Sequence, residues 1–350
     1  MSLHPQQRLL IRADAAYEIG TGHVMRCLAL AHAWQAAGGQ CSFAMSWSIS
    51  GLEERLEADG CTVHRSEPPA DLAADALHTA TLAKEIDAQW IVVDGYRFDS
   101  PYIESLRRHG FRVLLIDDEG RLPHYTADVV LNQNLQAAPS LYAHRSAHTR
   151  LLLGTRYTML RKEFYPYRGI RRETSAVGRK VLITMGGSDP LNVTPLAIEA
   201  VRLLEHGQVE ARIIVGGGNP RHTELVASVS DTPNFHIVHD VVDMTPHLEW
   251  ADAAITGAGS TCWELALIGV PMLTVVLADN QWPIAAALSE AEAGVNLGRA
   301  ETLSSAAIAA QLHVILPDAD LRARMRHNAQ TVVDGFGGDR VVAALRTDPP

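Results

Sequence analysis

The sequence predicts an α/β protein built from two doubly wound halves. Short apolar runs alternate with helical stretches, and the runs are apolar on both faces, which is typical of buried parallel strands. The alternation stops in a polar, basic and aperiodic stretch near residues 155–178 and then starts again. Two sheets, each covered by helices and joined at that stretch, are the simplest architecture for this pattern.

In the first half, five apolar runs are expected to form strands. They read RLLIRADA, CSFAMS, WIVVDGY, FRVLLIDD and ADVVLNQN, at residues 8–15, 41–46, 90–96, 111–118 and 127–134. Helical periodicity lies between some of them, at residues 24–38 and 101–110. Strands that alternate with helices predict a parallel sheet.

The second half repeats the pattern. Its expected strands read VLITMGGSD, ARIIVGGG, FHIVHD, DAAITGAG and PMLTVVL, at residues 181–189, 211–218, 235–240, 252–259 and 271–277. We therefore assign residues 1–160 to an N-terminal domain, 161–178 to a linker and 179–345 to a C-terminal domain. The last helical segment, near residues 318–334, can pack on either half.

Composition excludes several classes of protein. The chain has 350 residues, of which 47% are hydrophobic and 20% charged, enough for two globular domains. Its formal net charge is −10 and its basic residues form no stripe, which argues against a nucleic-acid partner. No apolar run approaches the roughly 20 residues of a membrane helix, and the N-terminus does not resemble a secretory leader. We expect a cytoplasmic protein with no membrane partner.

The cysteines and most histidines carry no ligand pattern. Four cysteines lie far apart without a Cys-x-x-Cys pair, so neither a zinc site nor a disulfide framework is expected. Other histidines, His32 among them, also lack metal-ligand spacing and are expected at the surface. The sequence therefore predicts no metal site.

The turn EIGTGHVM, after the first strand, is the first of four candidate ligand turns. In doubly wound sheets, ligands bind beyond the carboxyl ends of the strands. Gly20 and Gly22 permit a tight turn and close backbone approach, and Thr21 leads into the next helix. His23 follows in the first helical turn, where the positive end of the helix dipole favours a neutral ring that can accept a proton. The alternative is a structural glycine turn with a surface histidine.

The second turn is MGGSDPLN, after the first strand of the second half. Gly186, Gly187 and Ser188 offer backbone N–H groups and a hydroxyl to an anion. Asp189 is a further candidate for substrate contact, although Asp189 or Asn192 can equally cap the following helix. An anion site and a helix cap both remain open for this turn.

The third turn, TGAGSTCWE, precedes a helix that contains Glu264. Gly259, Ser260 and Thr261 supply N–H groups and hydroxyls where a phosphate would meet the helix N-terminus. Glu264, one turn on, can reach two neighbouring sugar hydroxyls or simply pair with the helix dipole.

The fourth turn, ADNQWPIAAAL, carries two amides. Asn280 and Gln281 suit recognition of hydroxyls or a base, or capping. No dinucleotide or nucleoside triphosphate fingerprint is present, because GTGHVM has Met25 at the third small position and no G-x-x-x-x-G-K-[ST] run exists. We therefore expect no cofactor. We expect an enzyme that acts on a nucleotide-diphosphate sugar. One half would supply the histidine, and the other would supply the anion-binding turns and a carboxylate for a sugar ring.

Four segments together resemble the UDP-sugar hydrolases of the pseudaminic acid pathway, members of the GT-B superfamily. They read IRADAAYEIGTGHVMRCLALA, LGTRYTMLRKEF, MGGSDPLN and GAGSTCWELALIGVP, and they fall in order between residue 11 and about residue 285. The resemblance implies a GT-B-like fold, with two Rossmann-like domains that face a central cleft. It also implies hydrolysis of UDP-2,4-diacetamido-2,4,6-trideoxy-β-L-altrose to the free sugar and UDP.

The same resemblance implies roles for individual residues. His23 is the candidate base, Arg161 and Ser188 approach the pyrophosphate, and Glu264 holds the ribose. Sugar contacts are carried over to three further positions in looser matches: Asp14, Tyr96 and Asn134.

The chemistry of these residue types is consistent with that reaction. UDP is a good leaving group, because its departing oxygen has little proton affinity and helix N–H dipoles stabilise the growing charge. One base is then sufficient, whereas ordinary glycosidases need two carboxylates. Neutral His23 would activate water opposite UDP and give inversion, and Arg161 would contact the pyrophosphate without a bound cation. We therefore expect a metal-independent reaction.

Two other functions fit the same turns. A GT-B glycosyltransferase would use His23 to deprotonate an acceptor hydroxyl instead of water. A non-catalytic nucleotide-sugar-binding protein would bind UDP stoichiometrically and would not depend on His23.

Overall fold

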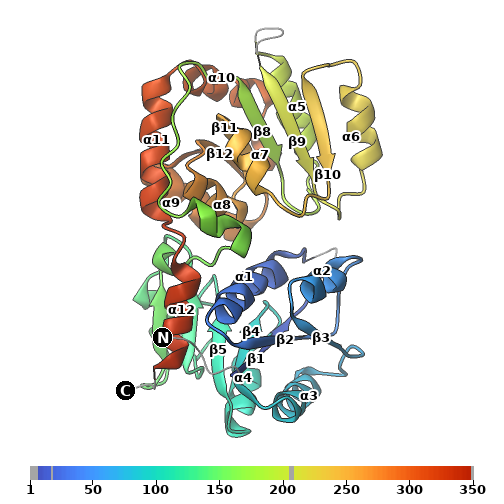
Figure 1. The fold of residues 1–350 in the computed structure, drawn as a ribbon, viewed down its shortest axis with the longest axis vertical. Coiled ribbons are helices and arrows are strands. Elements are labelled where there is room, and N and C mark those ends of the chain that lie inside the picture. Colours follow the sequence, from blue (N-terminus) through green and yellow to red (C-terminus); the bar gives the residue numbers. More distant parts are fainter. Residues whose placement is uncertain (1–6, 17–18, 205–208, 348–350) are drawn as a thin grey trace. The chain divides into compact units, whose positions relative to one another are not determined.

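The computed structural model describes residues 7–16, 19–204 and 209–347 and divides the chain into two units (Figure 1). Unit 1 comprises Met1–Lys162 and Gly335–Pro350, and unit 2 comprises Glu163–Asp334. Each unit buries its own apolar core. The α/β class with two doubly wound halves is therefore confirmed.

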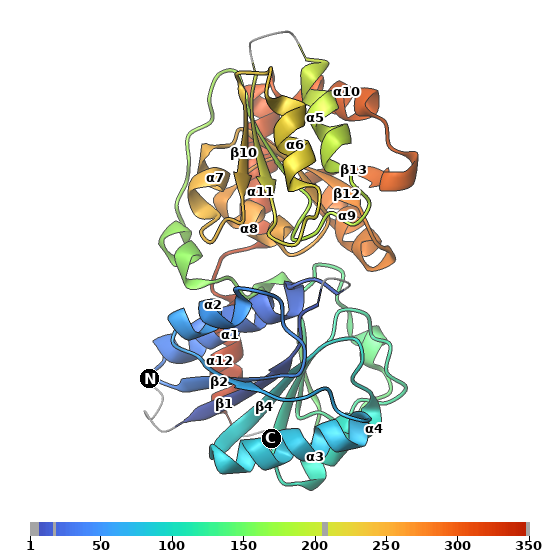
Figure 2. The same cartoon turned by 90° about the vertical axis from the view of Figure 1, so that its right-hand side faces the viewer.

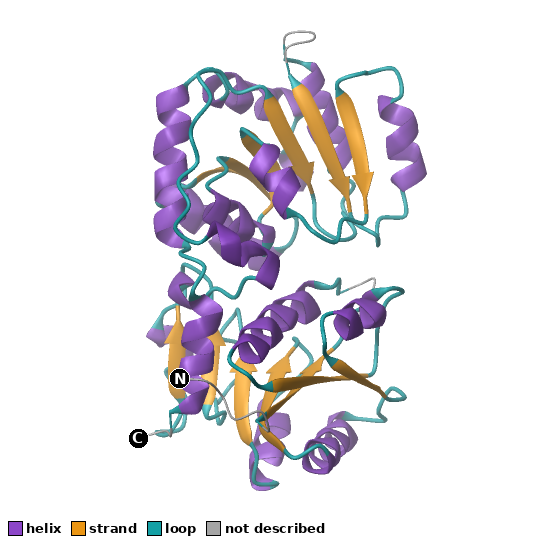
Figure 3. Ribbon diagram, viewed as in Figure 1, coloured by secondary structure: helices purple, strands orange, loops and turns teal. Residues whose placement is uncertain are grey.

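In the described part of unit 1, seven parallel strands form one sheet in the order β3-β2-β1-β4-β5-β6-β7 (Figure 3). The strands are β1 (Arg8–Ala13), β2 (Gln40–Met45), β3 (Thr62–Arg65), β4 (Ala88–Asp94), β5 (Arg112–Ile116), β6 (Val129–Asn132) and β7 (Arg150–Leu153). The direction of winding reverses between β1 and β4. That reversal is the switch point where doubly wound sheets bind ligands, beyond the carboxyl ends of the strands.

Helices cover both faces of this sheet (Figure 2). They are α1 (Gly22–Ala36), α2 (Leu52–Ala58), α3 (Leu72–Glu85), α4 (Ser100–Arg108) and α12 (Gly337–Arg346). Leu9 and Ile11 pack in the core that α1, α2 and α12 cover, whereas Leu10 packs in the core under α3 and α4. This alternation explains why β1 is apolar on both faces.

In the described part of unit 2, six parallel strands have the order β10-β9-β8-β11-β12-β13. They are β8 (Lys180–Thr184), β9 (Glu210–Val215), β10 (Phe235–His239), β11 (Ala253–Gly257), β12 (Met272–Val276) and β13 (Gly294–Arg299). Counted from its own first strand, this sheet has the order 3-2-1-4-5-6, as the first six strands of unit 1 do. Its switch point lies between β8 and β11.

The helices of unit 2 connect and cover its strands. They are α5 (Thr194–Arg202), α6 (His222–Val229), α7 (Thr245–Trp250), α8 (Thr261–Ile268), α9 (Trp282–Glu290), α10 (Ser305–Ile315) and α11 (Ala319–Val332). The helix expected near residues 318–334 is α11, and it packs on α8 within unit 2.

The boundary between the units differs from the expected linker at residues 161–178. The chain enters unit 2 at Glu163, and the following residues pack on that unit instead of forming a separate segment. Arg172 donates to the Ala251 carbonyl at 2.9 Å, and the Ser175 hydroxyl donates to Asp252 at 2.8 Å. At the other end, α12 belongs to unit 1, so residues 335–345 are not part of the C-terminal domain to which we assigned them.

A helix that crosses a bilayer must be both long and apolar. No helix within the described ranges combines the two.

Candidate active site

The turn before α1 brings His23 to the switch point of unit 1. Gly20 has φ +72°, a conformation that favours glycine, and its N–H donates to the Ala16 carbonyl at 2.8 Å. The turn ends at Thr21, the N-cap of α1, and His23 is the second residue of that helix. Because β1 pairs with β4, the glycine turn that follows β1 places the imidazole at the carboxyl end of β4.

The imidazole of His23 is bonded to a buried carboxylate. Its Nδ1 lies 2.8 Å from Oδ1 of Asp94, the last residue of β4. An ionised carboxylate only accepts hydrogen bonds, so Nδ1 donates to Asp94, and the neutral tautomer that this bond selects has its lone pair on Nε2. The Tyr96 ring meets the imidazole edge-on, with centroids 4.8 Å apart. His23 is 8% exposed, so the alternative of a surface histidine is wrong.

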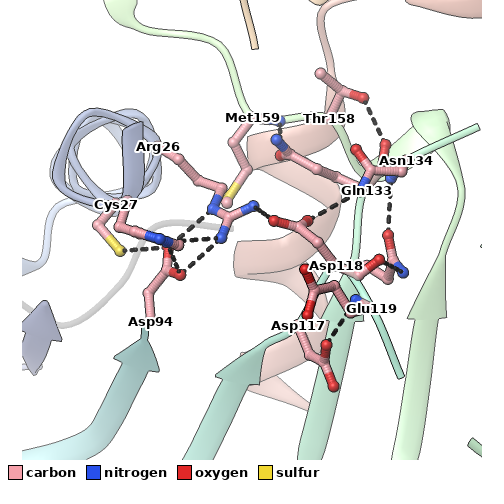
Figure 4. A network of polar contacts seen from close by, with 12 residues as sticks. Arg26, Cys27, Asp94, Asp117, Asp118, Glu119, Gln133, Asn134, Thr158 and Met159 are labelled. Carbon is pink, nitrogen blue, oxygen red and sulfur yellow. Dashed lines mark hydrogen bonds and ion pairs between the residues drawn. The ribbon is translucent and has the colours of Figure 1, made fainter. Parts of the chain in front are cut away.

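Asp94 is held ionised by its neighbours (Figure 4). Arg26 donates to it twice, from Nη2 at 2.6 Å and from Nε at 2.8 Å, and the Cys27 thiol donates at 3.4 Å. Burial by itself would raise the pKa of Asp94, but the charge of Arg26 and the hydrogen bonds from His23 and Arg26 outweigh it and hold the pKa well below its usual range. The carboxylate is therefore a fixed negative partner for the histidine.

A second carboxylate extends this network. Arg26 also donates to Asp118 at 2.6 Å, and the Asn134 amide donates to the other oxygen of Asp118 at 2.9 Å (Figure 4). Asn134, expected to contact the sugar, is buried, and its amide nitrogen is used to hold Asp118. Its role in this structure is to support the network around Arg26.

A small pocket adjoins His23 at the carboxyl ends of β4 and β5. Its walls combine aromatic, basic and acidic side chains. The residues that line it are His23, Arg26, Asp94, Gly95, Tyr96, Phe98, Leu115, Ile116, Asp117, Asp118, Arg121 and Leu122. Concave polar sites of this kind, next to a residue with a perturbed pKa, are candidate active sites.

Three more residues expected to bind substrate lie in unit 1. Asp14 follows β1 and is buried, with Oδ1 accepting from the backbone N–H groups of Ser46 and Trp47. Tyr96 is 37% exposed beside His23. Arg161 is buried near the end of the first segment of unit 1, and its contact with a pyrophosphate stays a prediction.

In unit 2, the turn after β8 presents backbone groups at the switch point. Gly186 has φ +80° and is exposed with Gly187, while Ser188 is half-buried. The Gly187 carbonyl accepts from Gly218 N at 3.1 Å, and the turn is packed so closely on Gly216 that a Cβ there would clash with it. Binding of an anion by this exposed turn stays a prediction.

Asp189 does not take part in that way. Its two oxygens accept from Val193 N at 2.8 Å and Thr194 N at 2.9 Å, and the residue is 2% exposed. The carboxylate caps the start of α5, so the capping alternative is correct and the side chain is not available to a ligand.

The turn after β11 leads into the N-terminus of α8. Ser260 is the N-cap, but its side chain makes no capping bond, and both it and Thr261 are at least partly exposed. Two of the first N–H groups of α8 are bonded within the turn, Cys262 N to the Gly259 carbonyl at 3.1 Å and Trp263 N to the Ser260 carbonyl at 3.0 Å, so binding of a phosphate here stays a prediction. Gly259 is half-buried beside them, and Glu264, half-buried in the first turn, stays a predicted ribose contact.

The amides of the fourth turn have different roles. Gln281 Oε1 accepts from Leu277 N at 3.0 Å and so fixes the loop after β12. Asn280 lies in the exposed 3-10 turn Asp279–Gln281, where contact with a ligand stays a prediction.

Two parallel Rossmann-like sheets with these turns define a GT-B protein. The crystal structure of MurG from Acinetobacter baumannii has the same fold, with a TM-score of 0.66 over 97% of this chain and 99% of that one at 19% identity. Residues 181–336 match the model of the glycosyltransferase family 28 C-terminal domain.

Comparison of sequences gives the nearer relationship. The chain is 24% identical to the UDP-2,4-diacetamido-2,4,6-trideoxy-beta-L-altropyranose hydrolase of Campylobacter jejuni, over 78% of this chain and 93% of that one. It is 23% identical to the uncharacterized protein MJ1062 of Methanocaldococcus jannaschii, of which the match spans only 56%. The resemblance to the UDP-diacetamido-trideoxy-altropyranose hydrolase family is thereby confirmed.

Sequence reasoning missed Asp94 and Arg26. The signal was present in WIVVDGY, where a buried strand ends in an acidic residue. In a sheet of order 3-2-1-4, that strand end lies beside the turn that carries His23. Arg26 is one helical turn after His23, so both side chains reach the same carboxylate.

Proposed function

We propose that this protein hydrolyses a UDP-linked 2,4-diacetamido-2,4,6-trideoxy sugar to the free sugar and UDP. The observation that carries the proposal is the 2.8 Å bond between His23 Nδ1 and Asp94 at the switch point of unit 1. It leaves Nε2 as a proton acceptor beside a pocket, which is the geometry of a general base. The name of the Campylobacter jejuni relative supports the substrate class.

In the proposed reaction, His23 Nε2 takes a proton from water as the water oxygen attacks the anomeric carbon. The bond from that carbon to the UDP oxygen breaks on the opposite face, so the configuration inverts. Asp94 holds the ring in the required tautomer and stabilises the imidazolium that forms, as the aspartate of a hydrolase triad does.

Unit 2 would bind the leaving group. The N–H groups of the turn Gly186–Ser188 and of the α8 N-terminus would donate to the diphosphate oxygens, and Glu264 would hold the ribose. Arg161 would add charge-assisted hydrogen bonds to the pyrophosphate. UDP then leaves without a general acid, and we propose that no metal ion is needed.

A time course of anomeric NMR signals tests this proposal. Wild-type protein would be mixed with UDP-2,4-diacetamido-2,4,6-trideoxy-β-L-altrose, with and without EDTA. We expect UDP release, a first-formed sugar anomer opposite to that of the substrate, and equal rates in both samples. Retention of configuration, or a rate abolished by EDTA, would contradict the mechanism.

A glycosyltransferase is the second candidate, because residues 181–336 match a glycosyltransferase domain. The same experiment separates the two functions, since a transferase releases free sugar slowly without an acceptor. A protein that binds UDP with 1:1 stoichiometry and releases none from the sugar would instead be a non-catalytic binding protein.

A further inference from the structure

The proposed mechanism leaves unused a buried polar cluster at the carboxyl ends of β1 and β2. Arg12, on β1, is 2% exposed and donates from Nε and Nη2 to the two oxygens of Asp75, each at 2.9 Å. Its Nη1 donates to the Ala44 carbonyl at 3.2 Å. A buried guanidinium satisfied in this way is a rigid platform for the groups around it.

Asp14 is bonded to Arg12 through one carboxylate oxygen, whereas its other oxygen accepts no hydrogen bond from a described residue. Oδ1 lies 2.8 Å from Arg12 Nη1 and accepts from Ser46 N at 2.7 Å and from Trp47 N at 3.1 Å. Oδ2 accepts no hydrogen bond from any described residue, although Asp14 is only 5% exposed. Arg97 faces Oδ2 with its Nη1 3.7 Å away, too far for a hydrogen bond. A buried acceptor without a donor is costly, so a ligand that brings a donor is favoured there.

Arg97 and Trp47 complete the surroundings of that oxygen. Arg97 donates from Nη2 to Asp75, and its guanidinium lies over the Trp47 ring, 4.7 Å from the centroid. The Arg97 side chain is 29% exposed and Trp47 is 37% exposed. Both therefore reach the surface, and Arg97 follows Tyr96, whose ring contacts His23.

We propose that Asp14, Arg97 and Trp47 form a subsite that recognises an acetamido group of the sugar. An acetamido group has an N–H donor, a carbonyl acceptor and a methyl group. The N–H would donate to Asp14 Oδ2, the carbonyl would accept from Arg97 Nη1, and the methyl would pack on the Trp47 indole. A hydroxyl offers a donor but no methyl, and it matches only part of the subsite. The inference rests on the proposed function and extends it to the choice of sugar.

The test compares three UDP-sugars on wild-type protein and D14N. One sugar is the UDP-diacetamido-trideoxy sugar, and each of the other two has a hydroxyl in place of one acetamido group. D14N keeps an oxygen for the Ser46 and Trp47 N–H groups but presents a donor where Oδ2 stood. We expect kcat/KM for the diacetamido sugar to fall about 10- to 100-fold. For the analogue that lacks the recognised acetamido group, we expect a fall of less than about 3-fold.

Two further variants keep the test decisive. Asp128 also pairs with an arginine and a backbone N–H, those of Arg107 and Val113, but at the amino end of β5. D128N should therefore leave the selectivity among the three sugars unchanged. Trp47 is partly exposed, so W47A should fold even if D14N does not, and it should lose activity on the same sugars as D14N.

Equal losses on all three sugars, or unchanged selectivity in both D14N and W47A, would overturn the subsite. Failure of the proposed function gives a different result: the wild-type protein would release no UDP from the diacetamido sugar. In that case, dissociation constants of the three sugars, measured by calorimetry on the same variants, provide the same comparison. UDP alone should bind equally to wild-type protein and both variants.

Discussion

His23 and Asp94 are 71 residues apart in the chain and meet only because β1 and β4 are neighbours in the sheet. An uncharged side chain in place of Asp94 would not fix the histidine ring in the same way. A histidine without its carboxylate could rotate or take the other tautomer, and then Nε2 would carry the proton.

Replacement of His23 by alanine should remove the base and little else. We expect UDP release from the diacetamido sugar to fall about 10²- to 10⁴-fold, the usual contribution of a general base. UDP affinity, measured by calorimetry, should stay within 2-fold of wild type by our estimate, about the uncertainty of one such measurement. His109 is exposed at the end of α4, so H109A is the matched control. Activity of H23A close to that of H109A would exclude His23 as the base.

Replacement of Asp94 by asparagine should lower both activity and stability. We expect activity to fall about 100-fold or more because the ring loses its fixed tautomer. The free energy of unfolding at pH 7 should fall by about 3 kcal/mol, because a buried ion pair is broken.

The stability effect of D94N has a defined pH dependence. The pKa of Asp94 is depressed in the folded chain, so its ionised form stabilises the fold above the ordinary carboxyl pKa of about 3.9. That stabilisation is lost as the pH falls from there toward the folded value. Urea unfolding at pH 7 and pH 3 should show the difference between wild type and D94N shrinking at the lower pH. A difference that grows on acidification would contradict the assignment.

At the scale of residues, local patterns predicted His23 but not its surroundings. The glycine turn and the helix start are local signals, whereas the pairing of His23 with Asp94 depends on strand order. The same limit explains an error at His32, which we expected at the surface. It is 3% exposed within an apolar stretch of α1, and its Nδ1 accepts from Lys162 N at 3.1 Å. The partner of His32 lies 130 residues away in the chain, so the residues around His32 give no sign of this hydrogen bond.

Helix α12 shows how two glycines admit a close contact between elements. A Cβ on Gly337 would lie within 3.0 Å of the Thr158 backbone, and one on Gly338 would lie 2.9 Å from the Ala33 side chain on α1. Val341, Val342 and Leu345 of α12 then join the same core as α1. The helix that carries His23 is thus supported by the last helix of the described chain.

Substitution of Gly337 by alanine should therefore destabilise unit 1. The methyl group would meet backbone atoms that cannot move aside cheaply, so we expect a loss of about 2 kcal/mol or more. Thermal unfolding of G337A and of A343S, a change at an exposed position of the same helix, provides the comparison. Equal melting temperatures for the two variants would show that the contact is not tight.

The strands that the sequence did not predict are all at sheet edges. β3, β7 and β13 end their sheets, and each is largely half-buried or exposed. Their residues do not form the long apolar runs that identified the central strands, because one side of an edge strand meets solvent. The central strands were predicted because burial on both faces demands continuous apolar sequence.

Across the described chain, the two units repeat one strand order, and each has candidate ligand turns at the carboxyl ends of its strands. Sequence predicted this duplication because the alternation of strands and helices restarts after residue 178. It left open a return of the last helix to the first half, but it placed that helix near residues 318–334, whereas residues 335–350 are the ones that belong to unit 1. Pattern analysis assigns segments in order, and no local signal marks the return of the chain.

Unit 2 should fold by itself, because it is continuous in sequence and has its own core. We expect residues 163–334, expressed alone, to unfold cooperatively and to bind UDP. Ser188→Asp in this fragment would place a negative charge in the turn after β8 and should weaken UDP binding at least 10-fold, about the effect of losing one charge-assisted bond. Calorimetry measures the binding, and a fragment that folds but ignores UDP would contradict the assignment of the nucleotide to unit 2.

Because unit 2 interrupts unit 1 in the chain, the order of synthesis matters for the catalytic half. A ribosome makes His23 before unit 2, yet α12, which supports its helix, is made after unit 2. Nascent chains would hold a complete unit 2 while unit 1 still lacks α12. A chain cut before Gly337 would therefore lack the helix that packs against α1, although His23 lies far earlier in the sequence.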